Sequence, residues 1–442
     1  MNRRDFLRMS SAGTLLAAVP QEMLAQSPQN AAAMAGSGSA TWDPGKLLHL
    51  LPTVSDREML IKASVDFPLG AAPVLRVGSQ HVVGQMTDTR GEHWQFHAKG
   101  LEPGRRYRLL LVTGGKSGGK PLCAPWDLAT FPAPDARPDR VRLLTFTCAG
   151  GHEQLTFLPT AIRNRMLRRG LSFQPDAVIA NGDHVYWDLR SPLTIKNYGP
   201  RAVALAGSFD RSAVIFGSDN EFTLKRAAGP QIVPVYGTDF RSTPVFFIQD
   251  DHDYFDNDDA YDEIVTFPPD QFMTQAARAT QALYYPEFLP DSTRPAGLAG
   301  ASSAGRAMPI SESFGTLRYG RLLEVLLYTV RRTMTMAGPS AVFLEDTVEA
   351  WLKARMASTE VAHVVNAPSN PPGWTAGKWG EWYPDVLGSD GKLTLQITKP
   401  YWQSGWVKQH DRLMAAMSAM RGRVPLVMSG DLHAIAIGRM LH

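Results

Sequence analysis

The chain has little cysteine, no dense run of one charge, and no late apolar stretch of membrane-spanning length. Its 442 residues include only two cysteines, Cys123 and Cys148, which excludes a scaffold held together by many disulfides. The formal net charge is +3, and Lys and Arg form no dense cluster, so neither a nucleic-acid partner nor a polybasic membrane function is indicated. The composition, 44% hydrophobic and 20% charged, is typical of a globular chain with two or three domains.

The first residues carry a targeting pattern. Arg3 and Arg4, followed by Phe6 and Leu7, precede the modestly apolar residues 9–19, which are too few to span a bilayer. The pattern resembles a twin-arginine export signal, and the open alternative is a Sec signal or an amphipathic tail. We expect the twin-arginine machinery to be a partner, the protein to be periplasmic or secreted, and no transmembrane anchor to remain after signal removal.

Composition and periodicity predict four segments. Residues 1–40 are the export signal and a flexible stretch, 41–131 a small all-β sandwich, 132–140 a proline-rich linker, and 141–442 an α/β domain. Within the sandwich, alternating stretches predict strands at 74–77, 93–97 and 106–112. The turn from Leu101 to Tyr107 resembles a corner of fibronectin III/Ig-like sandwiches, where a tyrosine at the strand start anchors the turn.

The last segment alternates apolar runs with helical patterns. Strands are predicted at 141–147, 176–181, 244–248, 323–329, 361–366 and 424–428, and helices at 159–169, 340–356 and 407–420. Two long connections, 189–243 and 254–320, read as functional loops or insertions.

Polar clusters follow the strands directly. They are residues 182–186, 249–253 and 429–433, and we expect them to converge at the carboxyl edge of one parallel sheet. A hard cation needs several carboxylates, imidazoles or phenolates from different strands, so the edge predicts a metal site. Cys148 also ends a strand. A disulfide with Cys123 and a thiolate ligand are both open from spacing, and the strand-end position favours the thiolate.

Taken together, these motifs resemble the PhoD-like alkaline phosphatases of the calcineurin-like metallophosphoesterase superfamily. The resemblance implies a layered α/β fold with a polynuclear site that contains Fe(III), together with Ca²⁺, Zn²⁺ or another divalent ion. It implies a metal-bridging role for Asp183, iron ligation by Tyr186 and Cys148, and a ligand at Asp251, where most of the superfamily has Asn. By the same resemblance, His252 contacts the phosphate or protonates the leaving group, and Asp431 and His433 form the last metal-binding motif.

Other residues have two open interpretations. Arg331 and Arg332 hold a phosphate bidentately or form salt bridges with nearby acids. Asp253 binds calcium, orients water or is an ordinary loop residue. His152 stands near the superfamily's first motif, which here is altered, and its role as a ligand is open. His184 is expected to be a buried, satisfied histidine that points away from Asp183.

The expected function is that of an exported metal-dependent phosphoesterase. A metal-bound hydroxide attacks a small phosphate ester, and an uncoordinated histidine, His252, protonates the leaving alkoxide. Two rival hypotheses remain: an envelope binding or scaffold protein with a relic catalytic domain, and a phospholipase D-like lipid phosphodiesterase.

Overall fold

The computed structural model describes residues 42–114, 119–155, 157–187, 204–255, 268–289, 314–335, 338–370, 404–420 and 422–431. The chain divides into two units, Met1–Asp43 and Pro44–His442, and the description concerns the second. The predicted export signal lies outside the described residues, as do residues 189–203 of the first long connection and residues 256–267 and 290–313 of the second. Among the helices described, none is long and apolar enough to cross a membrane.

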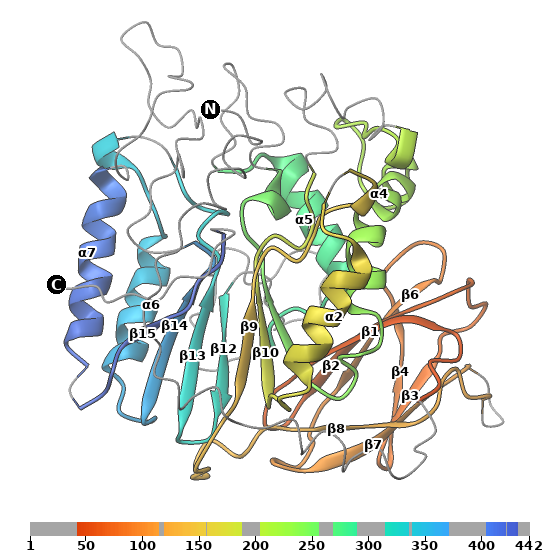
Figure 1. Ribbon diagram of the computed structural model, residues 1–442, viewed down its shortest axis with the longest axis horizontal. Helices are drawn as coiled ribbons and strands as arrows, with labels where there is room; N and C mark the ends of the chain where they lie inside the picture. Colours follow the sequence, from red (N-terminus) through yellow and green to blue (C-terminus); the bar gives the residue numbers. More distant parts are fainter. Residues whose placement is uncertain are drawn as a thin grey trace, which may run out of the picture. The chain divides into compact units, whose positions relative to one another are not determined.

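The first half of this unit consists of antiparallel β-structure (red to orange in Figure 1). Two four-stranded sheets have the orders β1-β2-β6-β5 and β4-β3-β7-β8. The predicted strands correspond to β3, β6 and β7, with nearly the predicted bounds. The strands are β1 (Leu47–Val54), β2 (Met59–Val65), β3 (Val74–Val77), β4 (Gln80–Val83), β5 (Gln85–Met86), β6 (His93–Ala98), β7 (Arg106–Val112) and β8 (Trp126–Ala129).

Tyr107 anchors the turn that precedes β7. Its hydroxyl oxygen accepts the backbone N–H of Glu102 at 2.7 Å, and its ring is buried. The hydrogen bond closes the turn over the start of the strand, as the sequence predicts for this tyrosine. The likeness to fibronectin III/Ig-like sandwiches and the predicted domain boundaries stay predictions.

The second half contains two sheets, so the prediction of one parallel sheet is wrong. In the first sheet, β10 pairs in parallel with both β9 and β11. The second sheet has the order β12-β13-β14-β15, in which β12 and β13 are antiparallel and the other pairs parallel. Each of the six predicted strands is present, and β12 is an additional strand that was not predicted. The strands are β9 (Leu143–Phe146), β10 (Ala177–Asn181), β11 (Val245–Ile248), β12 (Phe314–Tyr319), β13 (Leu323–Tyr328), β14 (His363–Pro368) and β15 (Leu426–Val427).

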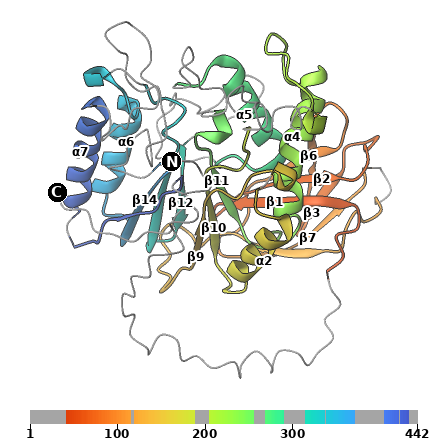
Figure 2. The same ribbon diagram turned by 45° about the horizontal axis from the view of Figure 1, so that its top comes forward.

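Helices flank these sheets (Figures 1 and 2). The α-helices are α2 (Thr160–Leu171), α4 (Asp219–Tyr236), α5 (Gln271–Tyr284), α6 (Asp346–Ala357) and α7 (Ser404–Ser418), and the 3₁₀ turns are η3 (Glu153–Leu155), η4 (His252–Tyr254) and η5 (Gly338–Ser340). The helix predicted from residue 340 starts only at Asp346, because a 3₁₀ turn and an extended stretch precede it. Helices α4 and α5 and strand β12 lie in the two connections read as loops, which corrects that interpretation.

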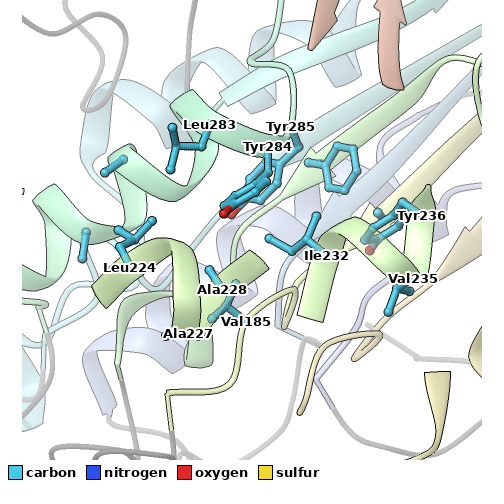
Figure 3. Close-up of a cluster of buried hydrophobic side chains, with 14 of the residues drawn as sticks. Val185, Leu224, Ala227, Ala228, Ile232, Val235, Tyr236, Leu283, Tyr284 and Tyr285 are labelled. Atoms are coloured by element: carbon cyan, nitrogen blue, oxygen red, sulfur yellow. The ribbon is translucent and has the colours of Figure 1, made fainter. Parts of the chain in front are cut away.

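A large apolar cluster fills the space between α4 and α5 (Figure 3). Small residues of α4, Ala227 and Ala228, let Leu283 and Tyr284 of α5 approach closely. Val185, from the loop after β10, belongs to the same cluster. The loop that carries Asp183 and Tyr186 is therefore packed against the core.

Candidate metal centre

The polar clusters do converge, although they come from two sheets. Cys148 follows β9, Asp183 follows β10 and Asp251 follows β11, whereas Asp431 follows β15 of the other sheet. Ligand atoms of Asp183, Asp251 and His252 lie within 4.8 Å of one another. The ligand atoms of a second group, Asp250, Asp251 and Asp431, lie equally close together. Asp251 belongs to both groups and links them.

Cys148 and Tyr186 reach the same carboxylate. The thiol of Cys148 donates to Oδ2 of Asp183 at 3.1 Å, and the hydroxyl of Tyr186 donates to the same oxygen at 3.1 Å. Neither Cys123 nor Cys148 forms a disulfide bond. A thiol, a phenol and a carboxylate therefore meet at one oxygen atom, close enough to share one cation.

The backbone is left-handed at three of these residues. The φ angles are 54° at Cys148, 58° at Asp183 and 74° at Asp431, three of the five positive values among the described non-glycine residues. Aspartate tolerates this region better than most residues, whereas cysteine does not. Such conformations cost of order 1–3 kcal/mol each and cluster at functional sites.

The glycines of the two Gly-Asp motifs are explained by close packing. A Cβ at Gly182 would lie 2.5 Å from Cβ of Asp250, and φ at Gly182 is +80°. A Cβ at Gly430 would lie 2.3 Å from the carbonyl oxygen of Asn181. Any side chain at either position would push apart the loops that carry the carboxylates.

Burial makes the negative charges of the site costly. Asp183, Asp250 and Asp251 are 0% exposed. Burial, opposed by Arg331, raises the pKa of Asp250 well above its ordinary range, and burial together with Asp183 raises the pKa of Cys148 and Tyr186. A nearby cation favours the ionised form of each group, so the cluster suits a positive charge.

Arg331 provides one such charge from the protein itself. Its Nε lies 3.2 Å from Oδ1 of Asp250, and its Nη2 lies 3.1 Å from Oδ2 of Asp431. The side chain is 2% exposed. Of the two open interpretations the structure shows the salt bridge, which joins the two sheets. Arg332 is only half-buried.

The remaining predicted residues have distinct environments. His184 is buried, and its Nε2 donates to the carbonyl oxygen of Ile248 at 2.9 Å, so the prediction of a satisfied histidine is confirmed. His152 is buried in the loop after β9, and its Nδ1 accepts the N–H of Gln154. His433, the stretch rich in tryptophan at 374–382, and residues just beyond the first two motifs lie outside the described residues.

Sequence reasoning missed three residues of this region. Asp250 belongs to one of the two groups above, although only its neighbours had been proposed as site residues. Asn370 follows β14 and donates from Nδ2 to Oδ2 of Asp431. Its position directly after an apolar strand is the same signal that identified the other clusters. Gln231 lies inside α4, where no sequence signal indicated it.

The residues present fit a metal centre. Oδ2 of Asp250 is buried and has no hydrogen-bond partner among the described atoms. Carboxylate oxygens dominate the donor set, which suits hard cations, and one thiol and one phenol stand on the Cys148 side.

Comparisons with known proteins agree with this fold. The solved structure of PhoD matches with a TM-score of 0.54 and 16% sequence identity, covering 90% of this chain and 73% of that one. The purple acid phosphatase PPD1 from yellow lupin (Lupinus luteus) seeds gives a TM-score of 0.47 and 12% identity over 76% of this chain and 53% of that one, which is too low to define a shared fold. No family model and no curated protein matches the sequence.

The chain therefore has a fold similar to that of PhoD. The resemblance to PhoD that the strand-end motifs predict is confirmed at the level of the fold.

Proposed function

We propose that this protein is a metal-dependent phosphoesterase that hydrolyses small phosphate esters. The observation that carries the proposal is the convergence of Asp183, Asp250, Asp251 and Asp431, with His252 beside them, in two overlapping groups of buried side chains. Buried carboxylates at such density are unfavourable unless cations neutralise them. The PhoD-like fold supports the same conclusion.

Each residue has a role in this scheme. Asp183 and Asp251 would hold the cations together with Cys148, Tyr186 and Asp431, and the last sequence motif adds His433 as a further ligand. Metal ions at this site supply an activated water and offset the charge that develops on the phosphoryl group. His252 carries the proton that the leaving alkoxide needs. Asp250 is charge-paired with Arg331, which leaves Arg331 to fix the carboxylates rather than the phosphate.

We propose iron(III) at the Cys148 and Tyr186 side, with Ca²⁺, Zn²⁺ or another divalent ion as its neighbour. The support is the pair of soft and phenolic donors on one carboxylate oxygen of Asp183. The purified protein should then absorb visible light through phenolate and thiolate charge transfer. Tyr186→Phe keeps the ring packing and should weaken or shift that band. A colourless, iron-free protein with full esterase activity would contradict the iron assignment and favour a dizinc or calcium site.

Elemental analysis combined with hydrolysis of paired chromogenic monoesters and diesters tests the proposed activity. We expect bound metal and turnover in the wild type, and loss of both in Asp183→Asn. Asparagine tolerates the left-handed backbone of residue 183 and removes only the charge. A metal-free wild type without turnover would favour a binding protein with a relic site. Preference for lipid diesters would favour the phospholipase D-like activity.

Export through the twin-arginine machinery is part of the proposal. It rests on Arg3, Arg4, Phe6 and Leu7. Replacing Arg3 and Arg4 by lysine in the full chain should retain the protein in the cytoplasm, which fractionation of the cells would show.

A further inference from the structure

Three loops carry the candidate ligands on the β11-β10-β9 side of the site. The first loop is residues 148–152, the second 182–187 and the third 249–254, each directly after a strand. Backbone N–H groups in such loops have no ladder partner and need acceptors from elsewhere. Two side chains that touch no metal in the proposed scheme, Gln231 and Asp253, supply many of these acceptors.

Gln231 joins the first loop to the second. Its Oε1 accepts the N–H of Gly151 at 2.7 Å and the N–H of Tyr186 at 2.8 Å. Its Nε2 donates to the carbonyl oxygens of Tyr186 at 3.2 Å and Ala227 at 3.0 Å. The amide is 0% exposed and uses its full capacity of two accepted and two donated hydrogen bonds. Tyr186 is thus held through both its N–H and its C=O.

Asp253 joins the second loop to the third. One oxygen, Oδ2, accepts the N–H groups of Asp183 at 3.0 Å and Asp250 at 2.9 Å. The other oxygen, Oδ1, accepts those of His184 at 2.9 Å and Val185 at 3.1 Å. The side chain is 2% exposed. Four backbone donors around one carboxylate fix the left-handed turn at Asp183, where φ is 58°.

The two side chains complete a chain of contacts across all three loops. Gln231 fixes the position of Tyr186 relative to the loop of Cys148, and Asp253 fixes the position of Asp183 relative to Asp250. Two direct backbone hydrogen bonds also join the first loop to the second, from the N–H of Cys148 to the carbonyl oxygen of Gly182 at 3.2 Å and from the N–H of Gly150 to that of Asp183 at 2.9 Å, and the two side chains add to these contacts. Gln231 comes from α4, outside the motifs, and its helix is packed in the core shown in Figure 3.

We propose that Gln231 and Asp253 act together as a backbone clamp that preorganises the three ligand loops before metal binds. This deepens the proposed function and names two positioning residues for its site. Preorganised ligands lose less entropy when they capture a cation, so the clamp raises metal affinity without contacting the metal.

Gln231→Leu tests the first half of the clamp against a matched control. Gln409 of α7 is also a buried amide: it accepts the N–H groups of Phe343 at 2.6 Å and Leu344 at 3.2 Å, and donates to Leu344 and Glu349. Gln409→Leu therefore removes the same chemistry away from the ligand loops. Both variants should lose stability.

Only Gln231→Leu should speed amide hydrogen exchange at Gly151 and Tyr186 in the metal-free protein. In the Zn²⁺-loaded protein, Gln231→Leu should also speed metal release to a chelator by about 10–100-fold. If Gln231→Leu and Gln409→Leu changed the rate of metal release equally, Gln231 would have only a general structural role and the clamp proposal would be wrong. If Gln231→Leu does not fold, Gln231→Glu answers the question. It keeps an acceptor for Gly151 and Tyr186, and should retain their protection.

Asp253→Asn tests the second half. The amide retains one acceptor oxygen but places a donor against two N–H groups, so exchange should accelerate at one pair, either Asp183 and Asp250 or His184 and Val185. Asp88→Asn is the control, because Asp88 is a buried carboxylate of the β-sandwich that also accepts backbone N–H groups, from Gly91 and Glu92. Unchanged exchange in the second loop of Asp253→Asn would overturn the proposal.

These outcomes separate the clamp from the proposed activity. Hydrogen exchange is measured without metal and without substrate, so it reports on the clamp even if the wild type hydrolyses no phosphate ester. If the wild type did not hydrolyse phosphate esters, the phosphoesterase proposal would be wrong, and the clamp proposal would be unaffected.

Discussion

At the scale of single residues, the ring of His252 packs against the ring of Tyr186. The two ring centroids are 4.2 Å apart with an interplanar angle of 35°, and His252 is buried. If His252 protonates the leaving group, His252→Ala should keep the metals but lose about 10²–10⁴-fold in rate on esters with poor leaving groups. Rates on a series of aryl and alkyl phosphates would measure this. Equal losses across the series would instead indicate that His252 orients the phosphate.

The candidate ligands show which site residues could be predicted from the sequence alone. Asp183, Tyr186 and Cys148 were predictable because each stands just after an apolar strand, and the structure brings them together. Gln231 was not predictable, since a glutamine inside a helix carries no local signal. The role of Asp253 was open, because only the folded backbone of the second loop shows that its carboxylate meets four N–H groups.

At the scale of elements, the nine strands that were predicted agree with the structure to within a few residues, whereas β1, β2, β4, β5, β8 and β12 were not predicted. Runs such as residues 176–181 contain little but apolar side chains, and β10 is buried at every position. Helix α4 was missed because Pro230 and Pro234 read as breakers, although packing against α5 stabilises the helix. Helix α5 did carry signals: Asp270 caps it by accepting the N–H of Met273.

His49 of β1 links the β1-β2-β6-β5 sheet to the end of α5. Its Nε2 can only donate to the carbonyl oxygen of Tyr284, so its Nδ1 accepts from the hydroxyl of Ser64 at 2.9 Å. Burial, with smaller contributions from His93 and Lys62 and against the Tyr284 hydrogen bond, lowers the pKa of His49 from 6.5 to about 3. The folded protein therefore keeps this ring neutral under conditions where the unfolded chain protonates it.

This difference predicts a pH dependence of stability. Between about pH 6.5 and pH 3 the unfolded chain binds one more proton at His49, so stability falls as the pH falls, by up to ~1.4 kcal/mol per pH unit. His49→Gln retains a donor and an acceptor but cannot titrate. Urea unfolding at pH 7 and pH 5 should show a smaller loss for His49→Gln than for the wild type. Parallel losses in both proteins would assign the acid sensitivity to other groups.

At the scale of the whole molecule, the site joins the two sheets of the α/β half. Cys148, Asp183 and Asp250 belong to the end of the β11-β10-β9 sheet, and Arg331 and Asp431 belong to the other sheet. Asn181 of β10 also donates to the carbonyl oxygen of Pro368 of β14 at 3.0 Å. Strand order along the chain could not reveal this pairing of sheet ends, because it depends on how the two sheets pack.

Arg331 should therefore contribute more to the stability of the metal-free protein than to that of the metal-loaded protein. It is buried between Asp250 and Asp431, and breaking such a pair typically costs about 3–5 kcal/mol because the carboxylates stay buried. A cation bound by the same carboxylates supplies part of the missing charge, and a ligand at 100 times its dissociation constant adds about 2.7 kcal/mol to the folded state. We expect Arg331→Leu to lower the melting temperature strongly after chelation and much less in the metal-loaded protein. The surface variant Arg108→Leu, which removes an exposed pair with Asp127, should lower both melting temperatures slightly and equally. An equal loss for Arg331→Leu with and without metal would show that the cations do not share its carboxylates.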